Sequence, residues 1–197
     1  MKDVLIEYMK RFSDLSESEL RRLTADVPVA SFRKGTVLLH QGDLPNQCYF
    51  VLEGCIRQFA VDEDGNEHTT NFFTEEQSIT VFTQHTSDGL SPYSLSCLED
   101  CTLIVGELAT EQEQYEMNPV LETMTRQMIQ EDMGVMRDDF SSFIASSPEE
   151  RYQTLMEKRP GLIDRVPQYQ LASYLGITPE SLSRIKKRSA RHLRIVE

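Results

Sequence analysis

The stretch QYQLASYLGITPESLSRIKK, Gln168–Lys187, lies near the C-terminal end of a 197-residue chain with a formal net charge of −12 at pH 7. Its apolar residues recur at the spacing of two short helices, and those on each helix share one face. They are Leu171 and Leu175 on the first helix and Leu182 and Ile185 on the second. Gly176 stands between the helices, where glycine readily adopts the left-handed backbone of a tight turn. The pattern predicts a helix-turn-helix, with Thr178 as the N-cap of its second helix.

The outward face of the second expected helix carries side chains suited to reading DNA bases: Glu180, Ser183, Arg184 and Lys187. An arginine can donate two hydrogen bonds to guanine, and a glutamate can accept one from cytosine. A second set is expected to contact phosphates, which adds affinity without base choice: Gln168, Tyr169, Thr178, Lys186, Arg188 and Arg191. The alternative is that these residues form the ordinary solvated face of an amphipathic helix.

Charge is divided unevenly along the chain. Residues 151–197 contain ten Lys/Arg and four Asp/Glu, a balance of +6, whereas residues 1–150 contain ten Lys/Arg and 28 Asp/Glu, a balance of −18. A basic segment joined to an acidic one is typical of a nucleic-acid-binding part attached to a part with another role. No apolar run approaches the roughly 20 residues that span a bilayer, and the N-terminus does not read as a signal peptide. We therefore expect a soluble cytoplasmic protein with no membrane partner.

Residues 27–106 have the texture of a β-domain. Short β-rich runs alternate with turn signals, and Asp64-Gly65 between two alternating runs predicts a hairpin. Strands so short and so closely spaced predict an antiparallel jelly roll or barrel. The preceding segment has helical periodicity, and Ser16 with Glu19 forms a capping-box pattern for a second short helix. The predicted fold class is therefore α+β.

A long helix is expected at about residues 118–144, beginning at Asn118-Pro119. Its apolar residues step by four, three, four and three, the spacing of a coiled-coil seam: Ile129, Met133, Met136, Phe140 and Phe143. We interpret this seam as a homodimer contact, with docking inside the same chain as the alternative. Ser147-Pro148 then begins another helix. The chain is thereby divided into a sensor with its dimerisation helix at residues 1–146 and a DNA-binding domain at residues 147–197.

Together these segments resemble the Crp/Fnr family of bacterial transcription regulators over nearly the whole chain. The matching residues are RKGTVLLHQGD with Gly35 and Gly42, CYFVLEGCIR with Gly54, and DEDGNE with Gly65. The resemblance implies a double-stranded β-roll sensor, a long dimerisation helix and a C-terminal DNA-binding domain. ESLSR, Glu180–Arg184, is similar to the recognition motif of the Fnr-type branch, which implies a TTGA-like half-site. The implied partners are double-stranded DNA, a second copy of the chain, RNA polymerase and an unidentified small-molecule effector.

The chain departs from the family pattern in several places. Residues 78–96, SITVFTQHTSDGLSPYSLS, contain neither the Gly-Glu nor the Arg-Ser/Thr pair with which relatives hold a cyclic nucleotide. A buried cyclic phosphate without a cationic partner is costly, so we expect no cyclic-AMP binding. Residues 188–197, RSARHLRIVE, are too short for the two-stranded wing that follows the recognition helix in many relatives. The first cysteine is Cys48, so an N-terminal iron-sulfur cluster is not expected, and we predict no cofactor.

The resemblance also implies a place for the effector. The family's pocket lies between the β-roll and the long helix, where the candidate residues are Phe72, Phe82, His85, Tyr93 and Met124. Each of them also suits an ordinary core position. A second interpretation is that the sensor region is now a structural platform for the dimer and binds no ligand.

The cysteines and histidines are the candidate redox or metal-binding residues. Cys97 and Cys101 are four residues apart, which suits either a redox or metal pair or two buried thiols. A cupin-like metalloenzyme, the competing hypothesis, would need a His-x-His pair, and none occurs in the sequence. We therefore predict neither an enzyme activity nor a metal site.

Overall fold

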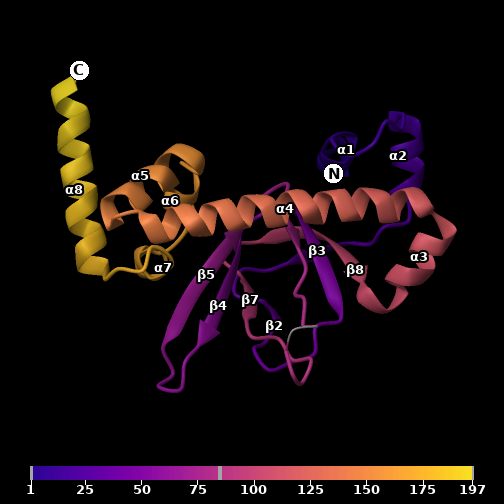
Figure 1. Cartoon of the computed structure of the whole chain (residues 1–197), viewed down its shortest axis with the longest axis horizontal. Helices are drawn as coiled ribbons and strands as arrows, with labels where there is room; N and C mark the ends of the chain where they lie inside the picture. Colours follow the sequence, from indigo (N-terminus) through magenta and orange to yellow (C-terminus); the bar gives the residue numbers. More distant parts are fainter. Residues whose placement is uncertain (1, 84–85, 197) are drawn as a thin grey trace.

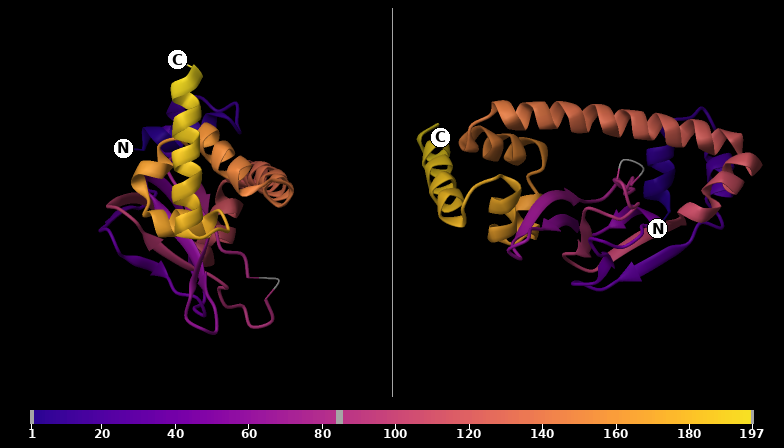
Figure 2. Two further views of the ribbon diagram at one scale, coloured as in Figure 1. Left: turned by 90° about the vertical axis from the view of Figure 1, so that its left-hand side faces the viewer. Right: turned by 60° about the horizontal axis from the view of Figure 1, so that its bottom comes forward.

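The computed structural model describes residues 2–83 and 86–196, with side chains except at residues 111, 112 and 190–196. Two antiparallel sheets form the body, one long helix, α4, runs along it, and a group of helices stands at its far end (Figure 1). Figure 2 shows that α4 spans the distance between the N-terminal helices and this group, which we call the head. His85 of the expected effector pocket lies outside the described residues, as does the side chain of Arg191. Within the described part of the chain, no helix is long and apolar enough to cross a membrane.

The β-roll consists of two four-stranded antiparallel sheets, with the orders β1-β8-β3-β6 and β2-β7-β4-β5. The strands are β1 Val29–Phe32, β2 Val37–Leu39, β3 Gln47–Glu53, β4 Ile56–Val61, β5 Glu67–Phe73, β6 Ser78–Ile79, β7 Ser94–Cys97 and β8 Cys101–Glu107. Buried side chains from both sheets, among them Val51, Ile56 and Leu103, fill the space between them. Short strands of this kind bury their apolar face only when two sheets pack together. The predicted α+β fold with an antiparallel roll is confirmed.

The local signals in the N-terminal half are also confirmed. The hairpin between β4 and β5 turns at Asp64-Gly65, and Gly65 adopts a φ of +83°. Helix α1 covers Asp3–Lys10 and α2 covers Glu17–Leu23. The hydroxyl of Ser16 accepts a hydrogen bond from the Glu19 N–H, and the Glu19 carboxylate accepts one of 2.9 Å from the Ser16 N–H. This reciprocal cap satisfies two backbone donors that a helix start would otherwise leave free.

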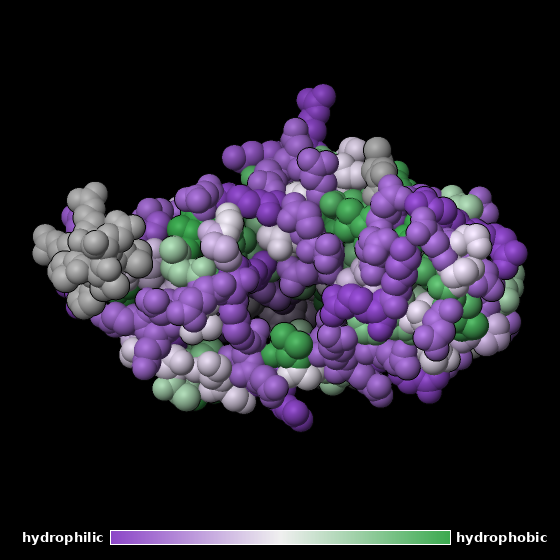
Figure 3. All heavy atoms as spheres, turned by 90° about the horizontal axis from the view of Figure 1, so that it is seen from above, coloured by the Kyte–Doolittle hydropathy of each residue, from purple (hydrophilic) through white to green (hydrophobic). Residues whose placement is uncertain are grey.

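Helix α4, Pro119–Ala145, follows a 3-10 turn at Leu108–Thr110 and the short helix α3, Glu111–Met117. The first half of α4 packs on the β-roll, where Met124 shares a buried cluster with Tyr8 and Phe50. The second half carries large apolar side chains that are 62–65% exposed: Met133, Met136, Phe140 and Ile144. The space-filling view in Figure 3 shows green hydrophobic patches between purple hydrophilic residues on the upper face of the molecule. The long helix is confirmed. Three of the five expected seam residues, Met133, Met136 and Phe140, are exposed, whereas Ile129 and Phe143 are half-buried within the chain.

The head contains α5, Pro148–Lys158, α6, Leu162–Arg165, α7, Gln168–Tyr174, and α8, Pro179–Val196. Ser147 caps α5 with a second capping box that includes Glu150. The core of the head extends to the β-roll, because Cys55 and Phe72 are buried in one cluster with side chains of α5, α7 and α8. In the described residues no strand follows α8, which continues to Val196.

Candidate nucleic-acid interface

The predicted helix-turn-helix is formed by α7, the turn at Gly176 and α8. Its inward residues are 0–3% exposed: Leu171, Ala172, Leu175, Leu182 and Ile185. Gly176 has a φ of +69°, and the Ile177 N–H donates a 3.0 Å hydrogen bond to the carbonyl of Ala172, which closes the end of α7. In Figure 1, α8 stands upright while α7 is seen almost end-on, so the two helices cross steeply. The apolar pattern in the sequence thus corresponds to one compact core.

The start of α8 is organised by Thr178. Its hydroxyl accepts a hydrogen bond of 3.2 Å from the Ser181 N–H, as expected of an N-cap. Hydrogen bonds from its own backbone N–H and from the Thr178 hydroxyl lower the pKa of the Glu180 carboxyl below its ordinary value. Glu180 is therefore an ionised acceptor at neutral pH, the state required to accept a hydrogen bond from a cytosine amino group.

The four expected base-reading residues lie on the side of α8 opposite its buried residues. Glu180, Arg184 and Lys187 are exposed, and Ser183 is half-buried. The guanidinium of Arg184 donates a 3.2 Å hydrogen bond to the hydroxyl of Ser181. Ser181 was not among the residues expected at the site, although its position three residues after the Thr178 cap could have suggested it. The structure therefore brings the four candidates together as one outward stripe.

The expected phosphate-contacting residues lie around this stripe in differing environments. Gln168, Tyr169 and Thr178 are exposed, and Lys186 is half-buried. The Tyr169 hydroxyl accepts a 3.1 Å hydrogen bond from the amide of Gln170, a residue that is 6% exposed. Arg188 forms an ion pair with Glu149 at the start of α5. A DNA phosphate would have to compete with this carboxylate for the Arg188 guanidinium.

Arg151 joins two elements of the fold, a link that sequence reasoning did not find. Its side chain donates hydrogen bonds to the carbonyl of Phe143 in α4, at 3.0 Å, and to the carbonyl of Leu175 at the helix-turn-helix turn, at 3.1 Å. The guanidinium also lies 3.9 Å from the centre of the Phe143 ring. The end of the long helix is thus bonded directly to the turn that sets the direction of α8. Nothing local in the sequence marks this residue, because its partners are 8 and 24 positions away.

The expected effector-pocket residues are not brought together. Phe72 lies on β5 and packs edge-on against Tyr174 of the head, with ring centres 5.3 Å apart. Met124 is buried in the separate cluster beneath α1. Phe82 is 46% exposed and Tyr93 is half-buried. The sequence placed these residues by family analogy alone, whereas strand alternation points Phe72 to the outer face of its sheet.

A cavity of about 510 Å³ lies instead between the β-roll and the head. Its lining is mostly charged: Lys34, Glu53, Gly54, Glu75, Glu99, Asp100 and Arg165. Pockets for drug-sized organic ligands are generally lined by apolar and aromatic side chains. This cavity therefore differs in character from an ordinary effector pocket.

Three of the four cysteines, Cys55, Cys97 and Cys101, are buried core thiols, whereas Cys48 is half-buried, and none of the four forms a disulfide within the described chain. Burial raises the pKa of the Cys55 thiol to about 12, and a hydrogen bond to Cys101 together with burial raises that of Cys97. The described residues contain no group of three or more His, Cys, Asp or Glu side chains arranged to hold a metal ion.

Residues 29–113 match the protein-family model of the cyclic nucleotide-binding domain, and no curated protein matches the chain. FixK2 from Bradyrhizobium japonicum is similar in structure, with a TM-score of 0.65 and 15% identity, over 84% of this chain and 85% of that one. The c-di-GMP responsive global regulator CLP of Xanthomonas campestris gives a TM-score of 0.64 and 17% identity, over 90% and 94%. The catabolite activator protein of Thermus thermophilus gives 0.50 and 20%, over 92% and 86%.

The matches to solved structures cover 84–92% of this chain, whereas the family match is confined to residues 29–113 of the β-roll region. At 15–20% identity the solved structures establish the fold, and the family match establishes the type of the β-roll. The chain therefore has the fold of the Crp/Fnr transcription regulators, with a cyclic nucleotide-binding domain at residues 29–113.

Proposed function

We propose that this protein is a transcription regulator that binds a pseudo-palindromic DNA operator as a homodimer. The observation that carries the proposal is the outward stripe on α8, whose opposite face is buried in the helix-turn-helix core. A helix anchored in this way can enter the major groove with its polar side chains against base edges. Arg184 would donate to guanine and Glu180 would accept from cytosine.

The dimer is supported by the partly exposed seam on α4. Three residues of the expected seam, Met133, Met136 and Phe140, and the neighbouring Ile144 are 62–65% exposed along its second half. A second copy of the helix would bury them, because 3–4 residue steps keep one seam facing a partner. The head of the same chain does not cover them, since it packs on the outer face of the β-roll through Phe72. Two heads in a dimer would place two α8 helices about 34 Å apart, one helical turn of DNA.

The sensor role is the less specific part of the proposal. We propose a cytoplasmic regulator whose β-roll responds to a small molecule other than cyclic AMP, and whose further partner is RNA polymerase. Absence from residues 78–96 of the arginine with which relatives hold the cyclic phosphate supports the exclusion of cyclic AMP. The scattered positions of Phe72 and Met124 support the alternative that the β-roll is a dimer platform without an effector.

The test is selection of DNA from a random pool by the full-length protein, followed by fluorescence anisotropy with the enriched duplex. We expect an enriched palindrome with two half-sites one helical turn apart. Native mass spectrometry of the same sample should show a dimer and any ligand carried through purification. A metalloenzyme would instead yield no enriched DNA and a stoichiometric metal ion in elemental analysis. That result would reverse the proposal.

A further inference from the structure

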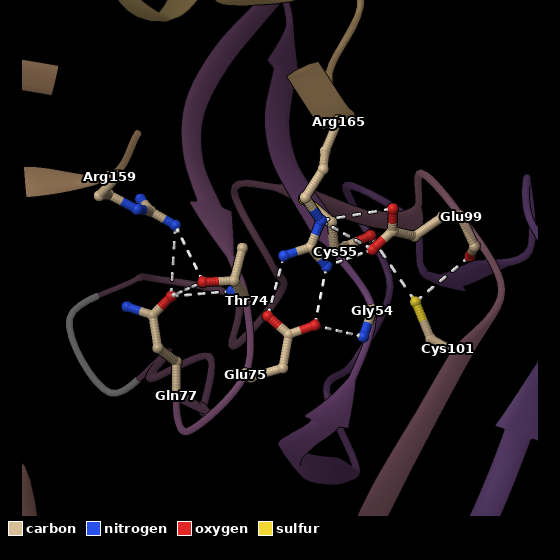
Figure 4. Close-up of polar contacts among 9 residues, drawn as sticks. All are labelled: Gly54, Cys55, Thr74, Glu75, Gln77, Glu99, Cys101, Arg159 and Arg165. Atoms are coloured by element: carbon tan, nitrogen blue, oxygen red, sulfur yellow. Dashed lines mark hydrogen bonds and ion pairs between the residues drawn. The ribbon is translucent and has the colours of Figure 1, made fainter. Parts of the chain in front are cut away.

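Three turns of the β-roll converge on one arginine of the head, Arg165 at the end of α6 (Figure 4). Gly54 lies in the turn between β3 and β4, Glu75 in the turn between β5 and β6, and Glu99 at the corner between β7 and β8. We call these four residues the Arg165 junction. The residues from the β-roll are 66 to 111 positions away from Arg165 in the sequence, so only the packing of the head on the β-roll creates the junction.

Arg165 is held by both carboxylates. It donates two parallel hydrogen bonds to Glu75, of 2.9 and 2.8 Å, in the paired geometry that suits a guanidinium and a carboxylate. Its Nε and Nη2 donate to Glu99 on the other side, with the Nε bond at 3.1 Å. The Arg165 side chain is 28% exposed, less than in the surface ion pairs elsewhere on the chain, such as that of Arg21 at 54%. Because carboxylates bind the Arg165 guanidinium from two sides, they fix both the position and the rotation of α6.

Gly54 completes the arrangement from below. Its backbone N–H donates a 2.9 Å hydrogen bond to Glu75, on the same oxygen that Arg165 contacts. Its φ is +115°, and a Cβ here would lie 2.6 Å from the Sγ of Cys101 and 3.0 Å from the carbonyl of Asp100. Only glycine lets the β3–β4 turn pack this closely against the β7–β8 corner, and in that position the Gly54 N–H reaches Glu75. The turn is therefore built to orient the carboxylate.

The turn that carries Glu75 is held in a strained conformation. Glu76 has a φ of +65°, and it is the one residue other than glycine with a positive φ in the described chain. Its N–H donates to the carbonyl of Val51 at 3.0 Å, and the Val51 N–H donates to the carbonyl of Gln77 at 3.0 Å. A residue other than glycine stays in the left-handed backbone conformation only where surrounding contacts hold it there, and such residues are frequent at functional sites. Here β3 imposes the shape of the turn that presents Glu75.

Further contacts surround the Arg165 junction. Arg159 donates a 2.9 Å hydrogen bond to the carbonyl of Phe72, and Ser173 accepts one of 2.9 Å from the N–H of Thr69. These bonds run along β5 beside the edge-on contact of Phe72 with Tyr174. The head thus rests on the β-roll over an apolar centre, with Arg165 as its most highly bonded charged group there.

We infer that Arg165 is a positioning residue for DNA binding: the Arg165 junction fixes the orientation of the head, so that both recognition helices of a dimer face the operator at the required spacing. The inference rests on the proposed function. The stripe on α8 is exposed while the head is docked, so docking does not hide the DNA-reading residues. A loosened head would keep its own base contacts, but ordering two loosened heads on one operator would cost conformational entropy.

The test compares a palindromic duplex with a duplex that holds one half-site. Arg165→Gln and, from the β-roll side, Glu75→Gln should each weaken binding to the palindrome about tenfold, a typical size for coupling between sites, with the half-site affinity unchanged within about twofold. Arg165→Lys should restore binding only in part, because lysine lacks the paired geometry. Arg21→Gln is the matched control, since Arg21 also contacts two carboxylates, Asp3 and Glu17, far from the head. Equal weakening on both duplexes, or tighter binding to the palindrome, would overturn the positioning role.

Hydrogen-deuterium exchange provides a readout that does not depend on DNA. In both variants at the Arg165 junction, the backbone amides of peptides covering residues 67–77 and 162–174 should exchange about tenfold faster. Peptides from the paired strands β3 and β8 should exchange at an unchanged rate. Unchanged exchange at the docking surface would show that Arg165 does not hold the head, even if DNA binding by the wild type is confirmed. If no DNA is enriched by the wild type while exchange still rises in the variants, the proposed function fails and the docking contact stands.

Discussion

Replacing Gly54 with alanine should destabilise the β-roll more than the same replacement at Gly65. Gly54 has a φ of +115° and Gly65 one of +83°, so alanine at either position incurs backbone strain of about 1–3 kcal/mol. At Gly65 the added Cβ meets nothing within 4 Å, whereas at Gly54 it would lie 2.6 Å from the Sγ and 2.9 Å from the Cα of Cys101. Because the Cα belongs to backbone, β8 must move, and overpacking of a core costs a further ~1–3 kcal/mol.

The free energy of unfolding, measured by urea titration with circular dichroism, should therefore fall by ~2–6 kcal/mol for Gly54→Ala and by ~1–3 kcal/mol for Gly65→Ala. In a protein of this size each kcal/mol lowers the melting temperature by about 2–4 °C, so thermal melts provide an independent check. The loss at Gly54 should also accelerate exchange around Glu75, which its N–H contacts. Equal destabilisation by the two substitutions would refute the argument that the β3–β4 turn needs a residue without a Cβ where it packs against Cys101.

Four further predictions concern DNA reading, pH, the thiols and the dimer. Arg184→Ala should cost ~1–3 kcal/mol of DNA-binding free energy and relax the preference at one base pair. Lys186→Ala should weaken binding to all DNA sequences alike and reduce the slope of log K against log salt concentration by about one. Anisotropy titration measures both effects. Burial alone would raise the pKa of Glu75, but hydrogen bonds from Arg165 and Gly54 outweigh it and lower the pKa to about 2. Because the pKa of Glu75 in the folded protein lies below its ordinary value of 4.5, its contribution to docking of the head should be full above about pH 4.5 and be lost towards pH 2, with Glu99, Glu53, Asp100 and Lys34 as the neighbouring charges. The head of Glu75→Gln is loosened at every pH, so this variant should lack that pH dependence. Iodoacetamide should leave Cys55 unmodified in the native protein and modify it after unfolding, as mass spectrometry of peptides would show. Phe140→Glu should give a monomer in native mass spectrometry that is still folded by circular dichroism, because the side chain is 63% exposed within the chain and takes no part in its core.

The sequence alone determined the features that depend on residues close together in the chain. The two caps at Ser16 and Ser147, the hairpin at Gly65 and the long helix α4 lie where the local pattern predicts them. The helix-turn-helix core was predictable for the same reason. Its spacing repeats within one or two turns of helix, and a three- or four-residue period leaves few other ways to bury the apolar side chains.

Only the tertiary structure decided where the head rests and what holds it there. Phe72, expected near an effector, packs against Tyr174, and Arg165 meets Glu75 and Glu99 from turns at the end of the β-roll. Arg151 joins α4 to the helix-turn-helix turn in the same manner. These contacts join segments up to about a hundred residues apart. The sequence around a charged residue does not indicate whether its side chain faces water or pairs with a distant carboxylate. The packing of whole helices and strands sets the partner, and this produces no periodic pattern in the neighbouring residues.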